Sequence, residues 1–133
     1  RSLYGLERAQ YVRLRKRGET DVVEITKRGE NRLLKYKFDN LAIQRPKKWD
    51  KKWHLVMFDI PAKKRRARRM FREALDRLEF LPYQKSVFVV PFECRDEVLF
   101  AARYLFIERC VQYVCADTLT GEETFRRKFK LAQ

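Results

Sequence analysis

Apolar positions in the second half of the chain alternate between the period of a strand and the period of a helix. Residues 54–60 (HLVMFDI) form a short run of bulky apolar side chains, which is typical of a buried strand. Over residues 67–78 the apolar positions recur at helical spacing. The opposite side of this predicted helix carries Arg65, Arg68, Arg69 and Arg72.

The same alternation continues to residue 116. The runs FLPYQ and KSVFVV predict two short strands, and Pro82 marks the first as an edge strand because proline cannot donate a ladder hydrogen bond. RDEVLFAARYLF then predicts a second helix, and VQYVCA predicts a last strand. The order β-α-β-β-α-β predicts an α+β fold with a ferredoxin-like domain over residues 54–117.

This topology predicts which strand ends meet. The first two strands run parallel through a right-handed crossover, and the third strand returns between them. The end of the first strand therefore lies beside the start of the third. We expect one edge of the sheet to gather Asp59, Pro61, Gln84, Lys85 and Ser86. Asp117 follows the last strand, so we expect it at the opposite edge.

The first third of the chain shows a different pattern. Residues 1–12 fit the last turns of a helix, after which apolar residues alternate with Arg13, Arg15 and Arg17, and VVEIT follows the turn-prone GETD. Thr26 is placed to cap a further helix. A helix end, a basic hairpin and a helix are typical of the second half of a winged helix. A small α+β appendage with a solvated hairpin is the alternative.

These patterns divide the chain into four parts. We expect residues 1–45 to be the C-terminal part of a winged-helix module, with its first helices upstream, and residues 46–53 to be a linker. Residues 54–117 form the ferredoxin-like domain, and residues 118–133 form a short C-terminal helix. Trp49 and Trp53 in the linker are more typical of a covered core edge than of stacking on bases.

The C-terminal segment carries its own signals. Thr120 and Glu123 have the spacing of a capping box, and Phe125 and Phe129 lie one turn apart. Such a pair predicts a helix that docks on the core of its own chain. Binding of a protein partner through this tail is the alternative.

Charge narrows the class of partner. The 133-residue chain has 32 Lys and Arg against 18 Asp and Glu, a net charge of +14, and more than half of the excess lies in residues 1–48. This balance predicts a polyanion, DNA or RNA, as partner. No run approaches the roughly 18 apolar residues of a membrane span, and no charged-then-apolar leader opens the chain, so we expect a cytoplasmic protein without a membrane partner.

Few residues are candidates for chemistry. Three cysteines without a CxxC pair and a single histidine, His54, do not fit a zinc site, so we expect free thiols and a packing role for the histidine. The sequence contains no glycine-rich phosphate loop and no histidine-based nucleophile pair. Asp59, which closes the first strand beside a basic helix, remains as the candidate acid.

Three stretches resemble a known family. HLVMFDIP, KKRRARRMFREALDRL and QKSVFVVP resemble the central domain of PaaX-type transcriptional regulators, which is itself similar to the Cas-two family of CRISPR adaptation proteins. The PaaX resemblance covers nearly the whole chain, and the Cas-two resemblance covers residues 54–117. Within the Cas-two motif, Asp59 matches the aspartate that closes the first strand, and Gln84, Ser86 and Phe88 match the Q-x-S-V-F stretch.

The two resemblances imply different functions. PaaX-type proteins are DNA-binding regulators, which implies a homodimer that binds double-stranded DNA and requires no cofactor. Cas-two proteins form homodimers in which the aspartate matched by Asp59 meets its symmetry mate and is associated with a divalent metal, here magnesium, and with endonuclease activity. A non-catalytic scaffold for spacer integration is a further alternative. Val89, Val90 and Pro91 stand where Cas-two members usually carry an acidic residue, which argues against the nuclease.

The basic residues and the acid therefore have separate expected roles. We expect the winged-helix part to contact phosphates through Arg13, Arg15, Arg17, Lys27 and Arg28, and the central domain to do so through Arg65, Arg68, Arg69 and Arg72. For Asp59 a metal shared across a dimer competes with two simpler roles. The carboxylate could cap the following turn, or it could pair with a cation such as Arg65 or Lys85.

Overall fold

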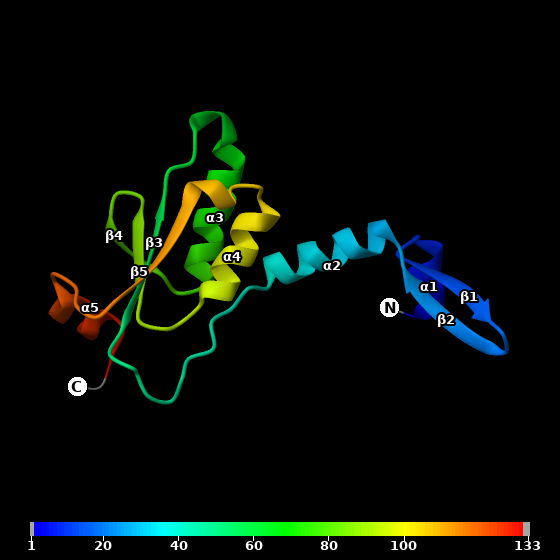
Figure 1. The fold of residues 1–133 in the computed structure, drawn as a ribbon, viewed down its shortest axis with the longest axis horizontal. Helices are drawn as coiled ribbons and strands as arrows, with labels where there is room; N and C mark the ends of the chain where they lie inside the picture. The colour runs from blue at the N-terminus through cyan, green and yellow to red at the C-terminus, as the bar shows by residue number, and fades with distance from the viewer. Residues whose placement is uncertain (1, 132–133) are drawn as a thin grey trace. The chain divides into compact units, whose positions relative to one another are not determined.

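The computed structural model describes residues 2–131 and divides into two compact units, with the boundary between Asn40 and Leu41. In the first unit a short helix is followed by a hairpin and a longer helix (Figure 1). Its elements are α1 (Leu3–Arg8), β1 (Val12–Arg17), β2 (Thr20–Ile25) and α2 (Lys27–Asp39).

The second unit contains a four-stranded sheet with helices on both faces (Figure 1). Its strands are β3 (Trp53–Phe58), β4 (Leu81–Gln84), β5 (Val87–Val90) and β6 (Val111–Ala116). Its helices are α3 (Arg65–Arg77), α4 (Arg95–Tyr104) and α5 (Glu122–Lys128), with short 3-10 helices η1 (Ala62–Lys64) and η2 (Glu108–Cys110). The predicted α+β class is confirmed.

Thr26 ties helix α2 to the hairpin of the first unit. Its side-chain oxygen accepts a hydrogen bond from the Gly29 N–H at 3.0 Å and donates one to the Gln10 carbonyl at 2.6 Å. The predicted cap is therefore present. Gly29 lies so close to the Tyr11 carbonyl that a Cβ atom at this position would clash with the backbone. A glycine here allows the close approach of helix and hairpin.

Strand order in the second unit follows the predicted topology. The order is β4-β5-β3-β6, and each neighbouring pair is antiparallel. The third strand of the series, β5, thus lies between the first and second, β3 and β4. Strand β4 is at the edge of the sheet. Pro82 has no N–H to donate, and an edge strand tolerates this because it pairs with a neighbour on one side only.

Helices α3 and α4 lie side by side on one face of the sheet and form the main core with it (Figure 1). Phe71 of α3 is fully buried and meets Phe58 of β3 edge to face, with 5.4 Å between ring centroids. Val98 and Ala102 of α4 are fully buried as well. The apolar side of α3 thus packs in the core, and the arginines on its other side lie at the surface.

Helix α5 covers part of the other face. The fully buried Trp53 ring lies 6.4 Å from both Phe125 and Phe129, measured between centroids, and its Nε1 donates to Glu122 Oε1 at 2.6 Å. Trp49 meets Trp53 edge to face at 5.1 Å. Packing within the chain therefore accounts for both tryptophans and both phenylalanines, while a protein partner for the tail stays a prediction.

The capping box predicted for the last helix is wrong. Helix α5 begins at Glu122, and its N-cap is Gly121, which takes φ +81° and provides no side-chain cap. Because Gly121 adopts the left-handed conformation, Thr120 lies one residue outside the N-cap position. None of the helices within residues 2–131 is long and apolar enough to cross a membrane.

Candidate nucleic-acid interface

The hairpin of the first unit exposes a row of cations. Arg13, Arg15, Lys16 and Arg17 of β1 are all exposed. Arg15 pairs with Glu24 across the hairpin at 2.8 Å, whereas neither Arg13 nor Arg17 forms an ion pair with any residue between 2 and 131. The sequence interpretation missed Lys16, because strict alternation placed it on the apolar side of the strand.

Three of the predicted wing residues meet in one place. Arg13, Lys27 and Arg28 line an open depression of about 520 Å³ together with Glu7 and Thr26. The Arg28 guanidinium lies over the Tyr11 ring, 5.5 Å from its centroid. This depression therefore joins the base of the hairpin to the first turn of α2 in one cationic surface.

The predicted arginine face of the second unit is formed by α3. Arg65, Arg68, Arg69 and Arg72 line an open depression of about 380 Å³, which also contains Glu73 and Asp76. The Arg72 guanidinium lies over Phe58, 5.9 Å from the ring centroid. The four arginines are thus brought together, and the two acids follow them in the chain.

Asp59 lies in a third depression, of about 440 Å³, where β3 ends. The backbone places it there: Phe58 N–H donates to the Ser86 carbonyl at 3.1 Å, and Asp59 N–H donates to the Cys110 carbonyl at 2.9 Å. Lys85 and Ser86 line the depression as expected, whereas Gln84 and Pro61 do not. Asp117 lies at the opposite end of β3, where Lys52 Nζ approaches its carboxylate at 3.4 Å.

The carboxylate of Asp59 is exposed, and Lys85 and Arg109 line the same depression. Among residues 2–131 this carboxylate forms neither a hydrogen bond nor an ion pair, so pairing with Arg65 or Lys85 and capping of the next turn do not occur. No group of three potential metal ligands exists in this described part of the chain. Asp59 is the one acid among the residues that line its depression.

Two polar neighbours of Asp59 were not predicted from the sequence. Arg109 and Gln112, near the start of β6, line the same depression. The predicted topology could have identified them, because the last strand runs antiparallel to the first and so begins where the first one ends. Of the other motif residues, the half-buried Phe88 stacks on Phe58 with 5.6 Å between ring centroids, and Gln84 is exposed at the end of β4.

His54 belongs to a buried polar cluster at the other end of β3. Its Nδ1 lies 2.9 Å from the Tyr113 hydroxyl, and that hydroxyl accepts from the Cys94 N–H at 3.1 Å. Burial lowers the pKa of His54, raises that of Tyr113, and raises the pKa of the Cys94 thiol to about 12. All three cysteines are free. The cluster is thus a packing element without a reactive thiolate at neutral pH.

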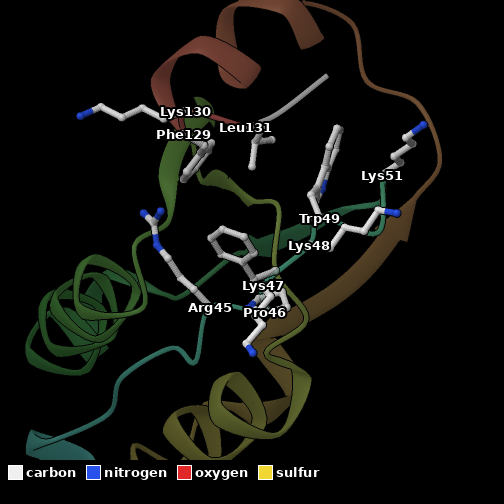
Figure 2. A pocket seen from close by; sticks show the side chains of 10 residues that line it. Arg45, Pro46, Lys47, Lys48, Trp49, Lys51, Phe129, Lys130 and Leu131 are labelled. Atoms are coloured by element: carbon white, nitrogen blue, oxygen red, sulfur yellow. The ribbon is translucent and has the colours of Figure 1, made fainter.

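A further cationic pocket lies beside α5, in the segment predicted as a linker. Figure 2 shows this pocket, which has a volume of about 320 Å³ and no acid among its ten lining residues. Trp49, Phe92 and Phe129 supply aromatic walls. Its cations are Arg45, Lys47, Lys48, Lys51 and Lys130, of which Arg45 pairs with Glu79 at 2.5 Å.

Comparison with models of protein families identifies the family of the chain. A family model described as the PaaX protein central Cas2-like domain matches residues 46–127, which begins in the lining of the pocket of Figure 2 and extends through most of α5. The predicted PaaX-like and Cas-two-like resemblance is therefore confirmed. Searches of curated proteins and of solved structures gave no significant match.

Proposed function

Because the chain belongs to the PaaX family through its central Cas2-like domain, we propose that it is a DNA-binding transcriptional regulator that acts as a homodimer. The observation that carries this proposal is the exposed cationic row of the β1–β2 hairpin. Arg13 and Arg17 have no carboxylate partner within residues 2–131, so their charge is available to phosphates.

The start of α3 supports the same conclusion for the second unit. Lys63 and Lys64 of η1 precede Arg65 and Arg66, and the first turn of α3 contains no acid and no side-chain cap. Cations at a helix N-terminus oppose the helix dipole, at roughly 0.3–1 kcal/mol each. A bound phosphate would offset this repulsion, so the segment favours an anionic partner.

Two copies would present two hairpins. Winged-helix dimers place equivalent contacts on the two halves of a paired site, so the proposed homodimer implies a duplex with repeated half-sites. Met57 supports self-association, because this apolar side chain remains 38% exposed on the sheet face at the rim of the Asp59 depression.

Salt dependence tests the proposal. Binding of the chain to labelled duplex DNA should weaken linearly on a log–log plot of affinity against salt, with a slope near −0.9 per phosphate neutralised. The double substitution Arg13→Ala and Arg17→Ala should reduce the magnitude of that slope by about two. Fluorescence anisotropy over a salt series measures both slopes.

A matched control uses a cation that already has a partner. Lys35 of α2 pairs with Asp39 at 2.7 Å, so Lys35→Ala should leave the slope unchanged. A duplex affinity that does not respond to salt would contradict DNA binding through phosphates.

A metal-dependent endonuclease is the second candidate, favoured by the exposed and unpaired carboxylate of Asp59. Magnesium prefers oxygen ligands, and a second Asp59 from another copy would have to supply what one chain lacks. Labelled DNA and RNA, incubated with and without magnesium, test this function. Cleavage should disappear in Asp59→Asn and persist in Asp117→Asn, which alters another exposed acid at the opposite end of β3. Unchanged cleavage in Asp59→Asn would remove the residue from any mechanism.

A further inference from the structure

The turn after α4 presents an aromatic ring to solvent. Phe106 is 84% exposed, more than any other large apolar side chain among residues 2–131, while the next residue, Ile107, is 1% exposed. A ring left in water beside a buried anchor gains nothing from the core of its own unit. Single exposed apolar side chains are common on protein surfaces, so the backbone position of this ring, and not its exposure alone, sets it apart.

The backbone at Phe106 makes this choice of residue more unusual. Phe106 takes φ +58°, and its N–H donates to the Arg103 carbonyl at 3.1 Å while the Ile107 N–H donates to the Ala102 carbonyl at 2.9 Å. These two bonds define a Schellman end, in which the left-handed position is usually glycine. A bulky residue there is strained, and strain of this kind is often retained for function.

Other helices of the chain end in the same way with different residues. Helices α1, α3 and α5 place Gln10, Glu79 and Lys130 at the equivalent left-handed position, with φ between +55° and +67°. All three are polar and suit exposure to water. The end of α4 thus differs from the other three helix ends, because an aromatic residue occupies the position that a polar residue occupies in each of them.

The backbone of the turn makes contacts beyond the end of α4. Lys64 Nζ, from η1, donates to the Phe106 carbonyl at 3.1 Å, and Arg103 pairs with Glu108 at 3.4 Å across the turn. Because the turn is already hydrogen-bonded to the end of α4, a ligand that packs on the ring meets an ordered backbone.

Several cations lie in or next to this turn, together with the acid Glu108. Lys63 and Lys64 belong to the segment that contacts the Phe106 carbonyl, and Arg109 follows three residues later in η2. Neither Lys63 nor Arg109 has an ion pair within residues 2–131. An exposed aromatic ring in a turn that carries cations without ion pairs has the chemistry of a platform for bases, with phosphates on the cations nearby.

We propose that Phe106 stacks on an unpaired nucleobase of a bound nucleic acid, while Lys63 and Arg109 contact the adjacent phosphates. An unpaired base offers its face without the unstacking that a wedge into an intact duplex requires, a cost of a few kcal/mol. The flanking charge disfavours a second copy as the occupant, because two such turns would bring like charges together. This contact goes beyond the duplex binding proposed for the hairpin and does not depend on it.

The test compares two labelled hairpin duplexes, one blunt and one with a short single-stranded overhang, bound to the whole chain. Wild type should bind the overhang substrate more tightly. Phe106→Gly should weaken binding of the overhang substrate by about 5- to 100-fold and leave binding of the blunt duplex unchanged. Phe106→Tyr, which keeps a ring, should behave as wild type.

Folding cannot explain such a loss, because glycine suits the left-handed position, and a thermal melt of Phe106→Gly should match or exceed that of wild type. Equal affinity of wild type and Phe106→Gly for the overhang substrate would overturn the proposal. So would a change confined to self-association in sedimentation. If the blunt duplex is not bound but overhang binding depends on Phe106, the regulator proposal fails and this inference stands.

Discussion

At the scale of single residues, the second unit keeps one titratable histidine in its interior. His54 is 3% exposed, and its Nε2 atom is buried without a hydrogen-bond partner among residues 2–131. Burial therefore favours the neutral ring, and the pKa of His54 lies below the ordinary value of 6.5. The unfolded chain, where the ring is in water, binds a proton more readily.

We expect the free energy of unfolding to fall in mild acid. Above a pH of about 6.5 the ring is neutral in both states, and His54 makes no difference; below it the unfolded state takes up the proton first, so stability is lost as the pH falls toward the lower folded pKa. Urea unfolding at a series of pH values measures this loss. In His54→Gln the free energy of unfolding should depend less on pH between the folded pKa and about 6.5. An unchanged dependence would mean that other groups cause the loss of stability.

The surroundings of single residues could be predicted only where they follow from the spacing of residues within one helix or strand. The arginines of α3 gather because they share one helical face, and Phe71 is buried because it lies on the other. The carboxylate of Asp59 was placed at the right edge, but its lack of a partner depends on side-chain directions that spacing does not specify. The exposure of Phe106 was not anticipated either, because its helical pattern continued through the turn.

At the scale of elements, two threonines show what a capping signal can and cannot predict. Thr26 and Thr120 each precede a helix-like run, yet only Thr26 caps a helix. The difference is Gly121, whose left-handed backbone moves the start of α5 by one residue. The edge position of strand β4 was easier to predict. Pro82 has no N–H to donate, and such a residue is found mainly on edge strands.

We expect Thr26→Ala to destabilise the protein by about 1 kcal/mol, because the Gly29 N–H loses its acceptor and the link to the Gln10 carbonyl is broken. Thr120→Ala serves as the control. Its side chain does not cap α5, so the change should stay within about 0.5 kcal/mol. Chemical unfolding followed by far-ultraviolet circular dichroism compares the two, and equal effects would contradict the assigned cap.

At the scale of the whole molecule, topology was easier to predict than the site. The strand order β4-β5-β3-β6 follows from the alternation of short apolar runs and amphipathic helices together with crossover handedness. Arg109 and Gln112 join Asp59 only through the long-range pairing of β6 with β3. The cationic pocket of Figure 2 likewise requires residues 45–51 and 129–131, far apart in sequence, to meet.

Both tryptophans of the chain lie together against α5, and this gives the protein an optical probe. Trp49 and Trp53 are the only two tryptophans in the sequence, and Trp53 contacts both phenylalanines of the last helical segment. Tryptophan emission, excited selectively at the long-wavelength side of the tyrosine absorption, therefore originates in one part of the second unit. A change in its wavelength reports on the seating of α5, while events at the hairpin can be followed at the same time with a separate dye.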